Sequence, residues 1–234
     1  MGHNAPMTAR GTLDRPDDTR HRIRLLAPAL LLAALTYPVT ELHPLAALLY
    51  ALLSIAVLTL GARVAAVSRW RELAATAVAA VIALLSVPWV MFPEQVWLSL
   101  GVYGLLVVFH LLVIAAVLGH LLAPGGTDHD VLVTGTSLYA LAGALFVPAA
   151  MIVHQGSALV GEAAYRAEGA ITWQRMVHFS FTTLTTVGSG DVAPATATAQ
   201  ALAAGEAMFG VLIVALIIGR LAGAVAAPAP RRGV

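Results

Sequence analysis

Long apolar segments, separated by short polar connections, run along almost the whole chain. Six of them approach the roughly 20 residues that an α-helix needs to cross the hydrocarbon core of a bilayer. They cover residues 25–42, 44–67, 73–92, 96–122, 131–154 and 197–226. The first is the weakest, because Pro28 and Pro38 fall inside it. The pattern predicts six transmembrane helices.

A seventh apolar stretch, residues 171–184, is too short to span a bilayer. Such a segment enters the membrane only where protein or a water-filled cavity covers its polar backbone. We therefore expect a re-entrant helix between the fifth and sixth spans. The predicted fold class is an all-α membrane protein with six transmembrane helices, a short re-entrant helix and the loop that follows it.

Composition supports a lipid environment. Of the 234 residues, 59% are hydrophobic and 11% are charged, whereas soluble domains average about 25% charged residues. The lipid bilayer is thus the expected partner of most of the surface. The formal net charge of +1 argues against a nucleic-acid partner, and the absence of cysteine excludes disulfides and thiolate metal sites.

The basic residues predict an orientation. All thirteen are arginine, which together with the many alanines suggests a bacterial protein of the inner (plasma) membrane. Six spans place eleven of the arginines on one side, which the positive-inside rule assigns to the cytoplasm. Only Arg166 and Arg175 fall on the other side. Both termini are therefore expected in the cytoplasm, and the short helix enters from outside.

The predicted organisation has four parts. Residues 1–24 form a polar cytoplasmic tail, residues 25–124 a four-helix transmembrane region, residues 131–227 a pore domain, and residues 228–234 a short tail. The fourth span, residues 96–122, contains no arginine. An arginine-rich helix is what couples membrane voltage to opening, so no voltage sensor is expected. No soluble regulatory domain is expected in the chain.

The segment that carries the chemistry reads Phe-Thr-Thr-Leu-Thr-Thr-Val-Gly-Ser-Gly-Asp-Val-Ala-Pro, residues 181–194, and lies between the short helix and the last span. It resembles the signature of the potassium-channel pore family, in which a Thr-Val-Gly-Tyr-Gly-Asp segment forms the selectivity filter. The whole chain is similar to a bacterial six-span channel with one pore loop. The resemblance implies a cation channel subunit that conducts potassium passively and assembles as a homotetramer.

Physical chemistry gives the same segment a role. A permeating cation exchanges its hydration shell for oxygen ligands, and rings of backbone carbonyls provide them without a full charge. To point successive carbonyls at one axis, alternate residues need unusual dihedrals, and Gly188 and Gly190 adopt φ > 0 at little steric cost. The predicted ion ligands are Thr186, Val187, Gly188 and Ser189. Thr185, Gly190 and Asp191 are expected to support them.

Ser189 departs from the family pattern, because it stands where the family usually has an aromatic residue that packs around the filter. Serine cannot fill that volume, so the choice between potassium and sodium stays open. Two alternatives to a potassium channel also stay open. One is a weakly selective cation channel, and the other is a non-conducting membrane scaffold or sensor that keeps the channel fold.

Three further residues are candidates beside the filter. His178 is the nearest expected partner of Asp191, either as a pH-responsive brace or as a plain interfacial histidine. Glu206, acidic and well inside the last span, either faces a water-filled vestibule or bonds the back of the pore helix near Thr182 or Thr183. Gly210 is either a gating hinge or a site of close helix packing.

No constellation of catalytic residues is visible. The sequence lacks a Ser/His/Asp grouping, a phosphate-binding glycine loop and an HExxH motif. We therefore expect no enzyme activity and no cofactor, with K⁺, or alternatively Na⁺, as the permeant ion in the filter. The gating stimulus and the role of the first four helices do not follow from the sequence.

Overall fold

The computed structural model of the protein describes residues 16–36, 40, 44–66, 69–92, 95–124 and 127–226. Within these ranges the chain forms seven α-helices and two short strands. In chain order they are α1 (Pro16–Thr36), α2 (Pro44–Ala65), α3 (Arg69–Met91), α4 (Val96–Leu122), α5 (Asp128–Leu159), β1 (Tyr165–Ala167), α6 (Trp173–Leu184), β2 (Val192–Pro194) and α7 (Ala197–Ala226).

Three of the helices are long and apolar enough to cross a membrane. Among the described residues these are Val96–Leu122, Asp128–Leu159 and Ala197–Gly223. Helix α2 contains a shorter apolar stretch, Leu49–Ala65. The molecule is thus a predominantly helical protein with three candidate spans, and the other three remain predictions from the sequence pattern.

The first helix lies earlier in the chain than the hydrophobic pattern predicted. It covers Pro16–Thr36 instead of 25–42, and residues 37–39 and 41–43 lie outside the described part of the chain. Proline at the first helical position followed by Asp17 and Asp18 is a favourable helix start, because acidic groups interact well with the helix N-terminus. Part of the segment assigned to a polar tail is therefore helical.

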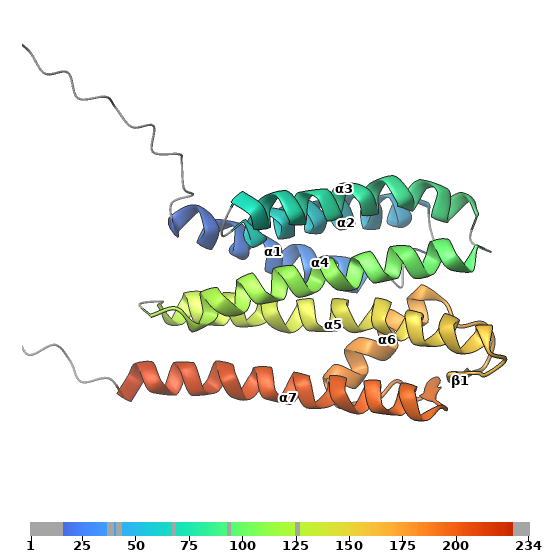
Figure 1. Cartoon of the computed structure of the whole chain (residues 1–234). Coiled ribbons are helices and arrows are strands. Elements are labelled where there is room, and N and C mark those ends of the chain that lie inside the picture. The colour runs from blue at the N-terminus through green and yellow to red at the C-terminus, as the bar shows by residue number, and fades with distance from the viewer. Residues whose placement is uncertain are drawn as a thin grey trace, which may run out of the picture.

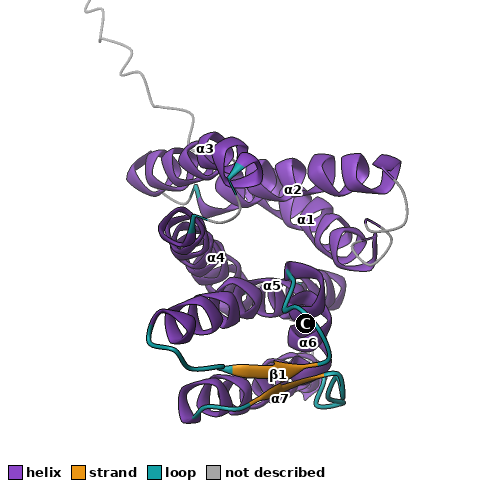
Figure 2. Ribbon diagram, turned by 90° about the vertical axis from the view of Figure 1, so that its right-hand side faces the viewer, coloured by secondary structure: helices purple, strands orange, loops and turns teal. Residues whose placement is uncertain are grey.

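The helices run roughly side by side, with the short α6 between α5 and α7 (Figure 1). Helices α1, α2 and α3 pack together, α4 contacts both this group and α5, and α5 contacts α7. Figure 2 shows this succession from the α1–α3 group through α4 and α5 to α7. Helix α5 is thus the central element, against which the N-terminal helices and the α6–α7 unit both pack.

A capping box starts helix α5. The Thr127 side chain accepts a hydrogen bond from the Asp130 amide, and the Asp130 carboxylate accepts one from the Thr127 amide. These two bonds satisfy helix-end donors that have no partner inside the helix. They begin α5 at Asp128, three residues before the predicted span.

The two strands form a feature that an all-α fold does not include. Strand β1 pairs with β2 in antiparallel fashion, with Tyr165 opposite Pro194 and Ala167 opposite Val192 (Figure 2). Strands of three residues are too short to show an alternating pattern in the sequence. The pairing joins the segment before α6 to the segment after residues 185–191, so it fixes the C-terminal end of that loop next to the chain that leads into α6.

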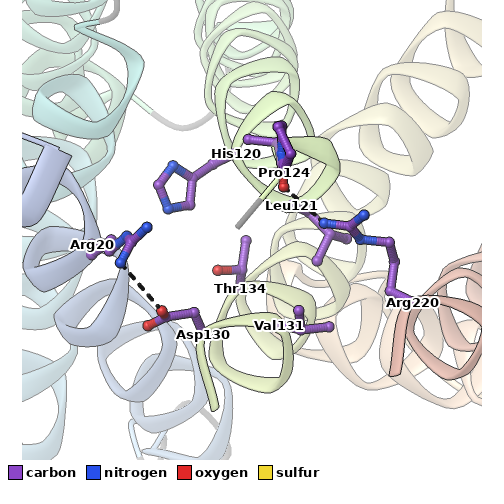
Figure 3. Close-up of a pocket in the computed structure, with 9 residues that line it drawn as sticks. Arg20, His120, Leu121, Pro124, Asp130, Val131, Thr134 and Arg220 are labelled. Atoms are coloured by element: carbon purple, nitrogen blue, oxygen red, sulfur yellow. Dashed lines mark hydrogen bonds and ion pairs between the residues drawn. The ribbon is translucent and has the colours of Figure 1, made fainter. Parts of the chain in front are cut away.

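Arginines that the sequence assigned to the cytoplasm gather at one end of the helices. Arg22 donates to the carbonyl of Arg63 at 3.3 Å, and Arg24 forms an ion pair with Asp130 at 2.7 Å. Figure 3 shows the same end, with Arg20 3.6 Å from the Asp130 carboxylate. The ends of α1, α2 and α5 therefore meet there, whereas the β1–β2 pair lies at the other end of the molecule (Figure 1).

Helix α7 reaches the same end. Arg220 donates to the carbonyl of Ala123, just beyond α4, at 2.8 Å (Figure 3). Arg10, Arg15, Arg231 and Arg232 lie outside the described residues. The contacts of Arg20, Arg22, Arg24, Arg63 and Arg220 thus place these five arginines at one end of the molecule.

Candidate functional site

Helix α6 has a defined start and a buried face. The Thr172 side chain accepts a hydrogen bond from the Arg175 amide and so caps the helix. Its buried residues are Met176, Val177, Phe179, Ser180 and Leu184. Their spacing of three and four residues places them on one stripe of the helix. This stripe fixes α6 against α5 and α7, which it contacts.

The C-terminus of α6 turns into the filter segment through two specific hydrogen bonds. The Thr186 amide donates to the Thr183 carbonyl at 2.9 Å, and the Val187 amide donates to the Thr182 carbonyl at 2.9 Å. These two bonds, together with a left-handed residue directly after the end of the helix, form a Schellman motif. Glycine usually occupies the left-handed position, and here it is Thr186, with φ = 62°.

Left-handed backbone recurs at every second residue along this loop. Thr186, Gly188 and Gly190 have φ values of 62°, 80° and 75°. The prediction that Gly188 and Gly190 adopt positive φ is confirmed, and Thr186 extends the alternation by one step. A non-glycine residue in this region is uncommon and costs of order 1–3 kcal/mol. The surrounding hydrogen bonds therefore hold Thr186 in a conformation that the isolated chain would avoid.

The backbone carbonyl groups of residues 186–189 point to no hydrogen-bond donor in the described part of the chain. Among the described residues, no hydrogen bond ends on the backbone oxygens of residues 186–189. By contrast, the Gly188 amide donates to the Thr182 carbonyl at 3.0 Å. The amides of residues 186–188 thus bond the C-terminal turn of α6, while the carbonyl oxygens of four successive residues accept no hydrogen bond from the described residues.

Residues 185–188 lie on the surface of the single chain. The Val187 side chain is 77% exposed, although a valine in an isolated soluble domain would usually be buried. Thr185, Thr186 and Gly188 are exposed as well. One chain therefore forms one wall of a possible ion pathway and leaves the opposite side open.

Ser189 makes local hydrogen bonds that the sequence did not indicate. Its hydroxyl donates to the Val192 carbonyl at 3.1 Å and accepts from the Val192 amide at 3.4 Å. Val192 is the first residue of β2 and is buried. The serine side chain thus joins the outer end of the loop to the strand pair.

His178 and Asp191 lie close together at the outer face of the loop. The distance from His178 Nδ1 to Asp191 Oδ1 is 3.7 Å. Both side chains are about half exposed, so solvent screens the attraction between them. The geometry is compatible with the predicted brace, in which the pair is ionic only while the imidazole is protonated.

Changing His178 to phenylalanine tests this brace. Histidine ordinarily changes charge between about pH 5 and 8, and the attraction to Asp191 is present when the ring is protonated and lost as the pH rises. We therefore expect ion flux in the unmodified protein to depend on external pH in this range and the His178→Phe protein to lose that dependence. Flux from vesicles at external pH 5, 6, 7 and 8 measures it. An identical pH profile in both proteins would rule out the brace.

Glu206 lies at a buried junction of three helices. Its side chain is 1% exposed, and the hydroxyl of Ser180 on α6 is hydrogen-bonded to its carboxyl group. The same hydroxyl lies 2.9 Å from the carbonyl oxygen of Gly143 on α5. Glu206 therefore bonds α6, as one of the two predictions had it, but its partner is Ser180 and not Thr182 or Thr183. The carboxyl group does not face a vestibule in the single chain.

Tyr165 of β1 lies near this junction. Burial, together with the charge of Glu206, raises the pKa of the Tyr165 hydroxyl above its usual value. The ring of Tyr165 packs edge-on against Phe179, with ring centres 5.4 Å apart. The strand pair thus packs against α6 through the contact between Tyr165 and Phe179.

The backbone at the end of α6 makes two close contacts. The hydroxyl of Tyr139 on α5 donates to the Leu184 carbonyl at 3.2 Å. A Cβ atom at Gly210 on α7 would lie 2.1 Å from the same carbonyl oxygen. Glycine at position 210 therefore permits α7 to touch the end of the pore helix. This contact accounts for the glycine without a hinge, so the gating role stays a prediction.

Sequence reasoning missed Tyr139, Gly143 and Ser180. Each contributes through a contact with another helix, which no local spacing reveals. A partial signal exists for Ser180, since a hydroxyl inside the apolar run of a short helix needs a partner when buried. Among the described residues, no group of three or more His, Cys, Asp or Glu side chains is arranged to hold a metal ion.

The comparisons with known proteins bear on this region. Residues 131–227 match a family model described as "Ion channel". The matched range includes most of α5 and all of β1, α6, the loop, β2 and α7. No curated protein and no solved structure matches the chain. The match and the three candidate spans together support a membrane protein whose C-terminal region is similar to an ion-channel family.

Proposed function

We propose that the chain is one subunit of a homotetrameric potassium channel in the plasma membrane. Potassium ions pass down their gradient along the axis where four copies of the loop meet. The carbonyl oxygens of Thr186, Val187, Gly188 and Ser189 coordinate the ions, and Thr185, Gly190 and Asp191 support the loop. No cofactor takes part.

The observation that carries this proposal is the alternating left-handed backbone at Thr186, Gly188 and Gly190. In an extended strand successive carbonyl groups point to opposite sides. When every second residue has left-handed backbone dihedrals, successive carbonyl groups point to the same side. Four such oxygens without partners form a ladder of ligands when several copies face one axis. This arrangement replaces the hydration shell of a cation without a full negative charge.

The electrostatics of α6 favour a cation at the inner end of the ladder. The helix ends at Leu184, directly before the loop. The C-terminal end of a helix dipole carries the equivalent of roughly half a negative charge. Four pore helices aimed at one axis therefore stabilise a cation below Thr186.

Ser189 supports a potassium preference in spite of its small size. Its two hydrogen bonds with Val192 restrain the outer end of the loop, which an aromatic cuff restrains in the family that the sequence resembles. A restrained loop keeps the distances between opposing carbonyls constant. We therefore favour potassium over the weakly selective alternative.

The orientation follows from the arginines. The end of the molecule that carries Arg20, Arg24 and Arg220 faces the cytoplasm under the positive-inside rule. The loop and the β1–β2 pair lie at the other end and face outward. Both termini are then cytoplasmic.

Ion flux into vesicles tests the proposed function. We expect purified protein in potassium-loaded vesicles to release potassium down an imposed gradient and to pass sodium at least about tenfold more slowly, a difference equivalent to about 1.4 kcal/mol. The Gly188→Asp protein is the control. It should pass neither ion, because a side chain at this positive φ strains the backbone and the carboxylate adds a charge beside the ligands.

Each other result has a defined meaning. Equal potassium and sodium flux would replace this proposal with a weakly selective cation channel. No flux of either ion from correctly assembled protein, at both imposed gradients and across the pH range, would favour the non-conducting scaffold. Cross-linking of the purified protein, which should give a ladder ending at four chains, tests the tetramer separately.

A further inference from the structure

A cavity of about 680 Å³ lies between the N-terminal helices and the pore helix. Small-molecule sites in proteins typically measure about 300–1,000 Å³. The walls include Leu30 of α1, Ile82 of α3 and Val102 of α4 on one side, and Trp173, Val177 and Phe181 of α6 on the other. The proposed channel function does not use this space.

The lining is apolar and carries no formal charge. No Asp, Glu, Lys or Arg is among the described residues that line the cavity. An ionic headgroup would therefore be buried there without a counter-charge, which is strongly unfavourable. The occupant must be neutral and largely apolar.

His110 supplies an unpaired polar atom in this wall. The residue lies in α4, lines the cavity and is 7% exposed. Its Nδ1 atom is 2.7 Å from the carbonyl oxygen of Leu106. A carbonyl only accepts, so Nδ1 carries the ring proton, and Nε2 presents a lone pair. Within the described part of the chain, no hydrogen bond reaches Nε2.

The hydroxyl groups of two serines at the cavity donate their protons to backbone carbonyls. Ser54 donates to the Tyr50 carbonyl at 2.8 Å, and Ser86 donates to the Ile82 carbonyl at 2.7 Å. The Ser86 oxygen, like His110 Nε2, is left as an acceptor, whereas Ser54 also bonds the Tyr50 side chain. A ligand that satisfies them must therefore donate a hydrogen bond.

We propose that this cavity binds a membrane-soluble alcohol, a neutral lipid whose hydroxyl group donates to Nε2 of His110. Its hydrocarbon part fills the space between α1, α3 and α6. A hydroxyl group is a donor that matches the acceptors of His110 and Ser86, and the Gln174 side chain also lines the space. Recognition requires an acceptor at position 110 and an apolar volume beside it.

The site also touches the pore helix at a sensitive place. The ring of Phe181 lies so close to Gly143 that a Cβ atom there would be 2.8 Å from it. Phe181 is three residues before Leu184, where α6 ends. An alcohol in the cavity therefore contacts the helix that positions the loop.

Photolabelling with a matched pair of probes tests the proposal on the full chain in vesicles. One probe is hexadecanol with a diazirine in its chain, and the other is its methyl ether, which keeps the chain and loses the donor. We expect the alcohol to label cavity-lining residues, identified by mass spectrometry, and to do so about two- to tenfold more efficiently than the ether at equal concentration, as one hydrogen bond predicts.

Variants separate recognition from general partitioning into lipid. His110→Phe keeps the ring volume and removes the acceptor, so labelling by the alcohol should fall to the level of the ether, while the ether labels as before. His154→Phe is the control, because His154 is a helix histidine that does not line the cavity. It should label like the unmodified protein.

Several results would overturn the proposal. They are an equal yield of alcohol and ether in the unmodified protein, labelling confined to residues outside the cavity, or unchanged alcohol labelling of the His110→Phe protein. The first two comparisons need no variant, so a folding defect in His110→Phe leaves the test intact. No ion flux is measured, and the outcome is therefore independent of the proposed channel function.

Discussion

Replacing Gly210 with alanine will prevent the pore region from packing, and we expect the yield of folded, assembled protein to fall severalfold. A Cβ atom at this position would lie 2.1 Å from the carbonyl oxygen of Leu184 and 3.1 Å from its carbonyl carbon. These are backbone atoms, which cannot turn aside as the end of a flexible side chain can. Either α7 or the end of α6 would have to move.

The cost of that movement exceeds that of ordinary overpacking. An additional methyl group in a well-packed core costs typically 1–3 kcal/mol. Here the displaced atoms also include the end of the helix that directs the loop, and Leu184 accepts the hydrogen bond of Tyr139. A change at Gly210 is thus expected to reduce both stability and potassium flux.

Gly205 provides a matched control in the same helix. A Cβ atom there would meet no other atom of the described chain within 4 Å. Gly205→Ala should therefore keep assembly and gain up to about 1 kcal/mol from helix propensity. Size-exclusion chromatography in detergent, followed by thermal unfolding, measures both variants. If Gly210→Ala assembles and unfolds like the unmodified protein, the close contact between α6 and α7 is wrong.

Replacing Glu206 with alanine should give the second largest loss. The change empties a buried volume and leaves the Ser180 hydroxyl with one partner fewer at a junction of α5, α6 and α7. The Ser180 hydroxyl keeps the Gly143 carbonyl as a partner, and the main cost is the cavity, about 2–5 kcal/mol for truncation of a large buried side chain to alanine. We expect a clear fall in the unfolding temperature of the purified protein, together with weaker potassium flux.

Glu206→Gln separates hydrogen bonding from charge. The serine hydroxyl has one proton and lies near two oxygens, those of Gly143 and Glu206, so a donor at position 206 completes the network. A glutamine amide offers such a donor in nearly the same shape. We therefore expect Glu206→Gln to retain most of the stability that Glu206→Ala loses.

Ser180→Ala completes the comparison. Because it removes the shared hydroxyl, the combined loss in the Ser180→Ala, Glu206→Ala protein should be smaller than the sum of the two single losses, as expected for groups in contact. Additive losses would show that the two side chains do not act together. Equal instability of Glu206→Gln and Glu206→Ala would show instead that the negative charge is needed.

The helices follow largely from local patterns in the sequence. The long apolar segments 96–122, 131–154 and 197–226 became α4, α5 and α7, because a chain in lipid satisfies its backbone polar groups within each helix. Their ends shifted by a few residues where caps decide them, as the Thr127–Asp130 capping box does for α5. The α1 boundary moved furthest, since proline and aspartate start a helix before the apolar run begins.

The backbone conformation of the loop is the part of the site that can be predicted from the residue types of the loop itself. Glycine at positions 188 and 190 predicted left-handed backbone, and both adopt it. The third left-handed residue, Thr186, could not be predicted, because threonine avoids that region unless other bonds hold it there. The bonds that do so come from Thr182 and Thr183 at the end of α6.

By itself, the sequence determined that most of this protein belongs in lipid, that a short helix precedes a glycine-containing loop, and which residues the loop contains. Those properties depend on hydrophobicity and backbone freedom, which each residue carries locally. Only the tertiary structure decided that Glu206 meets Ser180, that Gly210 touches Leu184 and that His110 lines a cavity between helices. The first two contacts join residues 26 positions apart in the sequence, and the third feature is a space between helices. All three arise only when the helices pack.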